Sequence, residues 1–221
     1  MIQVDIWSDI ACPWCYIGKR NFETALSGWE HRADVAVTWH SFELDPHAPA
    51  ERVGDLTERL ADKYGVSIEQ ARATQARITA LAADAGLDLH FETARSGNTF
   101  DGHRLVHLAA AHGKQDAMTE RLFSAYFSEG ELISDHETLA RLAGSVGLPA
   151  AEVGGTLGSD RYADDVRLDE STAHALGITA VPFFVVDRAY GASGAQPPAV
   201  LASLLDKACS ERRPVRGAGV S

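Results

Sequence analysis

Residues 2–15 read IQVDIWSDIACPWC, and this stretch decides the fold. Apolar residues occupy every second position of its first half, a period of two that predicts a β-strand. Two cysteines separated by two residues follow, with Pro13 where a first helical position is expected, because proline lacks the N–H that stays unpaired there. The stretch therefore predicts a strand, a loop over residues 8–11 and a helix that begins beside Cys12.

The cysteine pair predicts redox chemistry. A thiol at a helix N-terminus faces unpaired backbone N–H groups and the positive end of the helix dipole, and both favour the thiolate that attacks disulfides. We expect Cys12, nearest the helix end and more exposed, to attack the substrate, and Cys15 to resolve the mixed disulfide. Pro13 and Trp14 separate the two sulfurs and can tune the balance between dithiol and disulfide.

Two structural explanations of the pair are less favourable. A zinc site needs four ligands, commonly from two pairs, but the only other cysteine, Cys209, is isolated in the sequence. A structural disulfide between Cys12 and Cys15 would close a loop too short to restrain the unfolded chain much. We therefore expect a catalytic pair and no metal.

Composition limits the classes of partner. The 221 residues are 45% hydrophobic, enough for a packed core that needs neither disulfides nor metal. The net charge of −11 argues against nucleic acid or an anionic membrane as partner. The chain opens directly on the strand pattern, with no secretory leader and no membrane-spanning apolar run, so we expect a cytoplasmic protein. A CxxC pair in that reducing compartment is more often catalytic than structural.

The order of elements predicts an α/β protein with a thioredoxin-like fold. A strand–helix–strand unit comes first, with its second strand over residues 35–42, and a block of helices follows from about residue 55 to 175. Ser67 opens one of these helices with a capping box, and Asp135 caps another. Two short strands and a closing helix complete a βαβ…ββα order. The predicted thioredoxin-like domain comprises residues 1–44 and 177–210, the inserted all-helical domain residues 45–176, and a flexible tail residues 211–221.

Four motifs together carry a resemblance to a known family. They are Ser8-Asp9-x-x-Cys12-Pro13-Trp14-Cys15-x-x-Gly18, Asn98-Thr99-x-x-x-His103-Arg104, Gly177-Ile178-x-x-Val181-Pro182-x-Phe184 and Gly194-Ala195-Gln196. With them the chain resembles the DsbA-like thioredoxin-fold oxidoreductases, most closely their cytoplasmic FrnE-like branch. Ala180 departs from the glycine that often precedes the Val-Pro pair. Cys209 lacks the partner that some relatives carry, so we expect no second redox centre.

The resemblance implies a thiol–disulfide oxidoreductase, with protein disulfide oxidoreductase or isomerase activity. Its substrates would be proteins or small molecules that contain a disulfide or dithiol. No cofactor would be required, and glutathione would be an optional co-substrate. A homodimer is compatible with the family, although no heptad seam or apolar stripe marks an interface.

The resemblance also assigns a substrate-binding element, Val181-Pro182. In this fold a cis proline lies beside the CxxC pair and leaves the backbone of the preceding residue free to bind an extended substrate. Base rates alone favour a trans bond, with Pro182 starting an edge strand.

Three other polar residues have two interpretations each. We favour Asn98 as a helix cap over a residue facing the active site. For His103, a site-facing residue that moves protons and a satisfied buried histidine both stay open. Asp9 precedes the cysteines closely enough to change a thiol pKa or accept a proton, but we interpret it as an ordinary loop acid.

Two other functions fit the same architecture. A glutathione-dependent isomerase or kappa-class transferase would share the fold, but those relatives typically have serine at the first motif position. A chaperone-like binding module would use the helical block to hold unfolded chains, independently of both cysteines.

Overall fold

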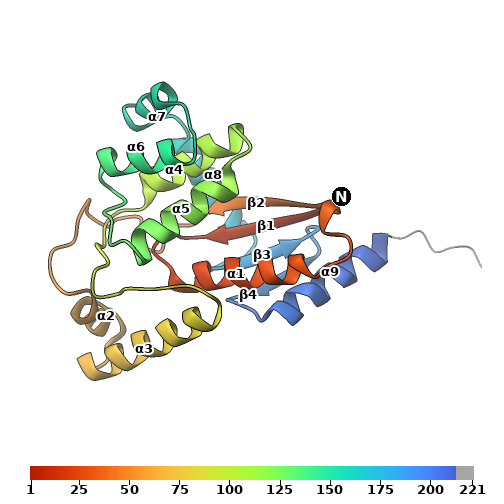
Figure 1. The fold of residues 1–221 in the computed structure, drawn as a ribbon, viewed down its shortest axis with the longest axis horizontal. Coiled ribbons are helices and arrows are strands. Elements are labelled where there is room, and N and C mark those ends of the chain that lie inside the picture. Colours follow the sequence, from red (N-terminus) through yellow and green to blue (C-terminus); the bar gives the residue numbers. More distant parts are fainter. Residues whose placement is uncertain (213–221) are drawn as a thin grey trace, which may run out of the picture.

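The computed structural model describes residues 1–212 and has an α/β fold around one four-stranded sheet, as predicted (Figure 1). The strands are β1 (Ile2–Ser8), β2 (Val35–Ser41), β3 (Phe183–Val186) and β4 (Tyr190–Ser193). Their order in the sheet is β2-β1-β3-β4. β1 is parallel to β2, with Ser8 opposite Ser41, and antiparallel to β3, with Ile6 opposite Phe184. The first and last parts of the chain therefore build one sheet.

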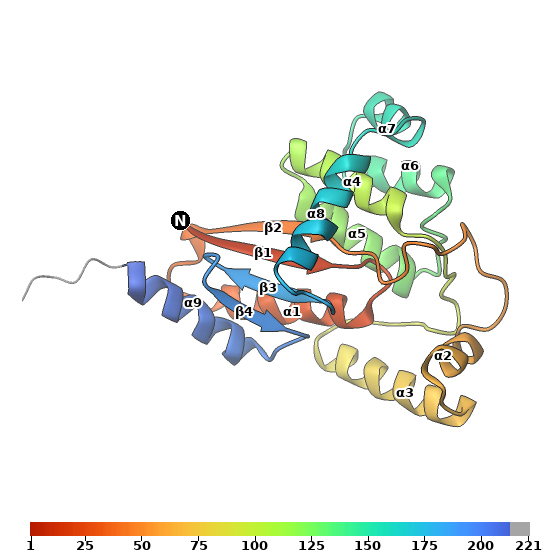
Figure 2. The same ribbon diagram turned by 180° about the vertical axis from the view of Figure 1, so that it is seen from behind.

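Two helices cover one face of this sheet. They are α1 (Pro13–Ser27) and α9 (Pro198–Arg212), which lie side by side in Figures 1 and 2. The α1 helix begins at Pro13 and ends before Gly28, as the sequence predicts. Its Phe22 ring lies 5.8 Å from the ring of Phe184 on β3, so this helix packs on the face that carries Ile6 and Phe184.

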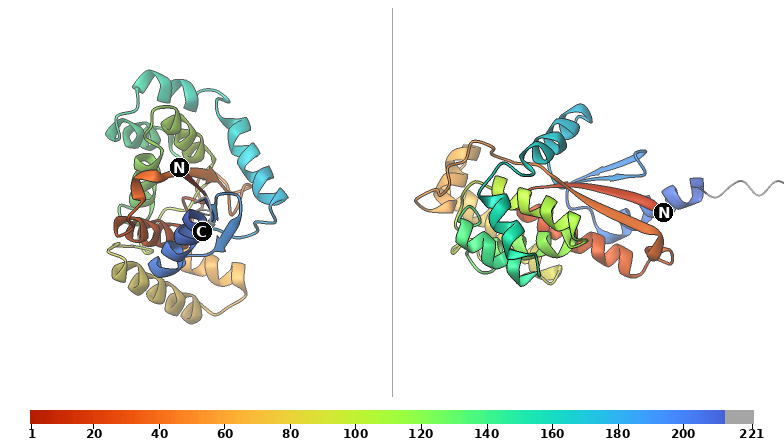
Figure 3. Two further views of the ribbon diagram at one scale, coloured as in Figure 1. Left: turned by 90° about the vertical axis from the view of Figure 1, so that its right-hand side faces the viewer. Right: turned by 90° about the horizontal axis from the view of Figure 1, so that it is seen from above.

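Seven helices come from the middle of the chain. They are α2 (Leu56–Tyr64), α3 (Ile68–Asp84), α4 (Phe100–Ala111), α5 (Gln115–Phe127), α6 (His136–Ser145), α7 (Ala150–Leu157) and α8 (Ala163–Ala175). The capping box at Ser67 is present in both directions, and Asp135 accepts a hydrogen bond from the Thr138 N–H at 2.8 Å. Viewed from above, α8 lies across the face of the sheet opposite to α1 and α9 (Figure 3).

The hydrophobic core runs through both parts of the chain. One cluster of buried side chains joins Ile6 and Phe184 of the sheet to Leu105 and Phe123 of the middle helices. The division into a thioredoxin-like domain and an inserted domain stays a prediction. Of the expected tail, residues 211 and 212 belong to α9, and residues 213–221 lie outside the described part. None of the described helices is long and apolar enough to cross a bilayer.

Candidate active site

The two cysteines meet at the N-terminus of α1. Cys12 is the residue that caps the helix, with an extended backbone, and Pro13 is the first helical residue. The Cys12 N–H donates to the Asp9 carbonyl at 3.1 Å, and the Cys12 carbonyl accepts from the Cys15 N–H at 3.0 Å. Both cysteines are free thiols. Burial raises the pKa of Cys15 well above its usual value, and a hydrogen bond to Cys12 raises it further.

Cys12 is the more exposed of the two cysteines, as expected, but both are buried. Its side chain belongs to the core with 4% of the residue exposed, against 0% for Cys15. The Cys12 Sγ lies 3.6 Å from the Val181 carbonyl oxygen, because the loop before β3 covers it. Trp14, between the cysteines, is 38% exposed and is the member of the motif that faces solvent.

The covering loop contains a cis proline. The Val181–Pro182 peptide bond is cis, as the resemblance implies. The Pro182 carbonyl accepts a hydrogen bond from the Gly194 N–H at 2.8 Å, which holds the loop where β4 ends. A Cβ atom on Gly18 of α1 would lie 2.9 Å from Pro182 Cγ. Glycine at this position therefore lets α1 approach the proline closely.

A buried carboxylate holds the loop that precedes the cysteines. Asp9 is 2% exposed, and its two oxygens accept hydrogen bonds from the N–H groups of Ala11 at 3.3 Å and Leu44 at 2.7 Å. His103 Nε2 of α4 lies 3.4 Å from Asp9 Oδ1. Asp9 is thus a loop acid, as interpreted, but a buried one that holds the loop through backbone N–H groups. His103 is a buried histidine that reaches the active-site loop.

Comparison with known proteins decides the family. Residues 3–206 match the family model described as DSBA-like thioredoxin domain. This chain belongs to the DsbA-like family. A protein from Streptomyces coelicolor described as a probable DsbA oxidoreductase is 45% identical, with a TM-score of 0.92 over 98% of this chain and 93% of that chain.

One further relative and one solved structure of lower identity extend the comparison. The uncharacterized protein YwbO of Bacillus subtilis (strain 168) is 30% identical over 199 residues, covering 84% of this chain and 86% of that protein. The cytosolic disulfide reductase DsbM of Pseudomonas aeruginosa, solved with GSH, has a TM-score of 0.67 at 17% identity, over 94% of this chain and 99% of that chain. This second likeness shows the shared fold alone. The assignment to the FrnE-like branch stays a prediction.

Asn98 directly precedes Thr99, the residue at the cap position of α4 in this DsbA-like chain. Its side-chain oxygen accepts a hydrogen bond from the Phe100 N–H, the first of α4, at 2.9 Å, and its amide donates to the Ala48 carbonyl at 3.3 Å. The side chain of Thr99 makes no capping hydrogen bond. Asn98 therefore satisfies the first N–H of α4 from one position before the cap, close to the favoured interpretation, and its partners are backbone groups rather than the cysteine pair.

Sequence reasoning missed a second buried acid near His103. The side chain of Glu43 is buried and pairs with Arg167 of α8 at 2.6 Å. Burial raises the pKa of Glu43, while Arg167 and the charge of His103 act against that rise. One Glu43 oxygen has no hydrogen-bond partner among the described residues. A glutamate two residues after a strand carries no local signal that could have identified it.

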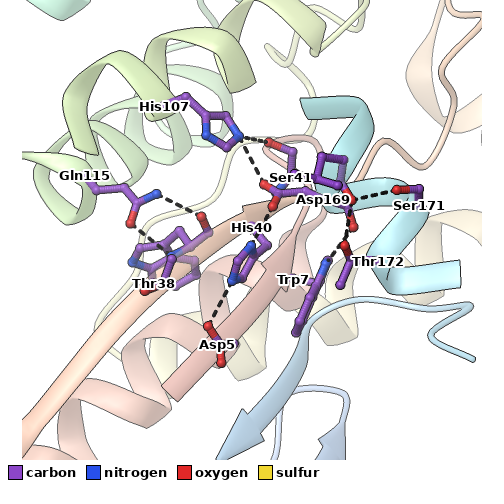
Figure 4. A network of polar contacts seen from close by, with 12 residues as sticks. Asp5, Trp7, Thr38, His40, Ser41, His107, Gln115, Asp169, Ser171 and Thr172 are labelled. Carbon is purple, nitrogen blue, oxygen red and sulfur yellow. Dashed lines mark hydrogen bonds and ion pairs between the residues drawn. The ribbon is translucent and has the colours of Figure 1, made fainter. Parts of the chain in front are cut away.

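A further polar network joins α8 to the sheet on the face away from α1 (Figure 4). Asp169 accepts hydrogen bonds from the Ser41 N–H at 2.8 Å and contacts the rings of His40 at 2.6 Å and His107 at 3.0 Å. Burial opposes ionisation of Asp169, but the bonds from the histidines outweigh it and hold its pKa well below the usual range. Burial likewise disfavours protonated His40, but Asp169 and Asp5 outweigh it and raise the His40 pKa. The network clamps α8 to the strands.

Proposed function

We propose that this chain is a thiol–disulfide oxidoreductase in which Cys12 attacks and Cys15 resolves. The observation that carries the proposal is the pair of free, buried thiols at the N-terminus of α1, with Cys12 Sγ 3.6 Å from the carbonyl of Val181 before the cis proline. The membership of the DsbA-like family supports the same chemistry. So does the 45% identity with a probable DsbA oxidoreductase.

The reaction needs only the two sulfurs and a substrate. The Cys12 thiolate attacks one sulfur of a substrate disulfide, a Cys12–substrate bond forms, and the other substrate sulfur leaves with the electron pair. Cys15 then attacks Cys12 Sγ, so the Cys12–Cys15 disulfide forms and the substrate is released as a dithiol. In reverse the same pair oxidises a substrate dithiol. No cofactor enters either direction.

The substrate-binding part of the proposal rests on Val181 and Pro182. Because the Val181 carbonyl lies against Cys12 Sγ, a chain that pairs with the backbone of this loop would bring its own sulfur to the attacking thiol. The substrate would be a protein or small molecule that carries a disulfide or dithiol. Glutathione is the small thiol we would test first as co-substrate, because DsbM, which shares the fold, was solved with GSH. A cytoplasmic location and a homodimer stay predictions.

Single cysteine variants test the proposal. Cys12→Ser should abolish disulfide exchange with a protein disulfide, because serine cannot attack sulfur under these conditions. Cys15→Ser should accumulate the mixed disulfide, visible by mass spectrometry as an adduct on Cys12. Cys209→Ser is the matched control and should keep its activity, because Cys209 lies on α9 and packs against the core. Full activity of Cys12→Ser would overturn the proposal.

The same variants distinguish the alternative enzyme. A glutathione-dependent isomerase or transferase would bind glutathione and would not require a second thiol. Glutathione-dependent turnover that survives Cys15→Ser without any mixed disulfide would therefore favour that function over dithiol exchange.

A further inference from the structure

The last residue of β1 places a hydroxyl beneath the first turn of α1. Side chains alternate between the faces of a strand, so Ser8 points to the same face as Ile6. Ile6 pairs with Phe184, whose ring lies against Phe22 of α1, so this is the α1 face. Trp7 points the other way, to Asp169 of α8, as Figure 4 shows.

The Ser8 hydroxyl is buried without a hydrogen-bond partner. Ser8 is 5% exposed, and its Oγ contacts no donor or acceptor among the described residues at hydrogen-bond geometry. A buried hydroxyl that has lost water and gained no partner costs free energy. This cost is explained if the partner is a group that becomes a strong acceptor only during the reaction.

Cys15 is such a group. It lies in the first turn of α1, fully buried, and burial together with Cys12 raises its pKa. Two neighbours act against that rise, the Ser8 hydroxyl and the backbone N–H of Asp9, and both lower the Cys15 pKa. A thiol accepts hydrogen bonds weakly, whereas a thiolate accepts them strongly.

We propose that Ser8 is a catalytic residue that donates its hydroxyl hydrogen bond to the Cys15 thiolate during resolution, with the Asp9 N–H as second donor. The inference rests on the proposed dithiol function and adds a residue to it. Cys15 loses its proton, its sulfur attacks Cys12 Sγ, the Cys12–substrate bond breaks, and the substrate sulfur leaves with the electron pair. The leaving thiolate takes up one proton through solvent, so protons balance and Ser8 keeps its own.

The titratable groups around this position come from three elements. Cys12 caps the same helix, the Asp9 carboxylate lies in the loop before it, and His103 of α4 contacts that carboxylate. None of these groups replaces the Ser8 hydroxyl as a neutral donor at Cys15. The pH profile of the resolving step therefore distinguishes loss of the Ser8 donor from a change in the charge of Cys12, Asp9 or His103.

The two thiol steps can be timed separately with the chromogenic disulfide DTNB, in a Cys209→Ser background so that only the pair reacts. The first thionitrobenzoate is released when Cys12 attacks, at a rate proportional to the DTNB concentration. The second is released when Cys15 resolves, at a rate independent of the DTNB concentration.

Losing one hydrogen bond to a charged group lowers the fraction of Cys15 present as thiolate about ten- to a hundredfold. Because a more basic thiolate is a better nucleophile, the second rate should fall about three- to tenfold in Ser8→Ala.

Three further variants make the outcome decisive. Ser8→Thr keeps the hydroxyl and Ser8→Val removes it at nearly equal size, so the first should resolve at the wild-type rate and the second should be slow. Ser41 lies opposite Ser8 on β2, and its buried hydroxyl pairs with His107. Ser41→Ala is therefore the control variant and should leave both phases unchanged. The pH profile of the second phase should move to higher pH in Ser8→Ala and Ser8→Val only.

The results separate this inference from the proposed function. If the second phase of Ser8→Val has a rate within twofold of wild type and an unchanged pH profile, the role of Ser8 is overturned while dithiol exchange stands. Absence of any second phase in the wild-type protein would overturn the proposed function itself, and the inference with it.

Discussion

Asp9 Oδ1 lies 3.4 Å from His103 Nε2, and this contact links the loop before the cysteines to α4. The same carboxylate accepts hydrogen bonds from the N–H groups of Ala11 and Leu44. One buried side chain thus connects the active-site loop, the segment after β2 and a helix from the middle of the chain. We infer that Asp9 sets the position of the loop that carries Cys12.

Asp9→Ala is expected to lower the free energy of unfolding by about 3 kcal/mol, because it removes the acceptor of two backbone N–H groups and two hydrogen bonds to a buried charged group. Asp9→Asn keeps an oxygen acceptor and should lose less. Urea unfolding measures both changes. Asp160→Ala removes an exposed loop acid as the control and should stay within about 0.5 kcal/mol of wild type. Equal stability of Asp9→Ala and wild type would contradict the loop-holding role.

The Asp169 network predicts a pH dependence of stability with two opposite slopes. The pKa of Asp169 is lowered from its ordinary 3.8, so its contribution is present above about pH 4 and is lost as the pH falls through the folded pKa. The pKa of His40 is raised from 6.5, so its contribution is present below pH 6.5 and is lost as the pH rises through the folded value. The network should therefore stabilise most between about pH 4.5 and 6.5.

Asp169→Asn tests that dependence. Removing one partner of a buried ion pair should cost roughly 3 kcal/mol near pH 5.5, and the loss should shrink toward pH 9 and toward pH 2. Urea unfolding at a series of pH values measures it. Asp165→Asn on the same helix, an exposed aspartate, is the control. A loss that is constant across the whole pH range would show that charge is not what holds α8 to the sheet.

Gly18 and Pro182 predict a steric effect on the active site. In Gly18→Ala the new methyl group would meet Pro182 Cγ at 2.9 Å, so either α1 or the cis-proline loop must move. Such overpacking typically costs about 1–3 kcal/mol. We expect disulfide exchange with a protein substrate to slow more than exchange with DTNB, because the displaced loop is the substrate-binding element.

A second glycine is the matched control for Gly18. Gly154 lies within α7 with no atom within 4 Å of the position of its missing Cβ. Gly154→Ala should therefore stabilise the protein by about 0.5–1 kcal/mol and leave exchange rates unchanged. Thermal unfolding and the two exchange assays together check both variants. If Gly18→Ala exchanges with protein substrates as fast as wild type, the close approach of α1 to Pro182 is not needed for activity.

Local patterns predicted most of the fold. The alternation in residues 2–8, proline at 13 and glycine at 28 marked β1 and α1, because each depends on backbone chemistry within a few residues. The capping residues Ser67 and Asp135 marked helix starts for the same reason. The cis proline needed the resemblance, since a Val-Pro pair carries no local sign of the bond's geometry.

The buried polar groups of the site could not be predicted in this way. Asp9 meets Leu44 and His103, residues far along the chain, so its burial is a tertiary property. Asp169 meets His40 and His107 for the same reason. The burial of Cys12 under the Val181 loop also arises from the approach of two ends of the chain.

The equilibrium between dithiol and disulfide at Cys12 and Cys15 tests the central claim most directly. The reduced protein would be incubated in a graded series of glutathione buffers, trapped by alkylation and weighed by mass spectrometry. The account predicts one intramolecular Cys12–Cys15 disulfide with a midpoint within the range of the thioredoxin fold, about −120 to −270 mV. A pair that stays reduced, or that only forms adducts with glutathione in every buffer, would contradict it.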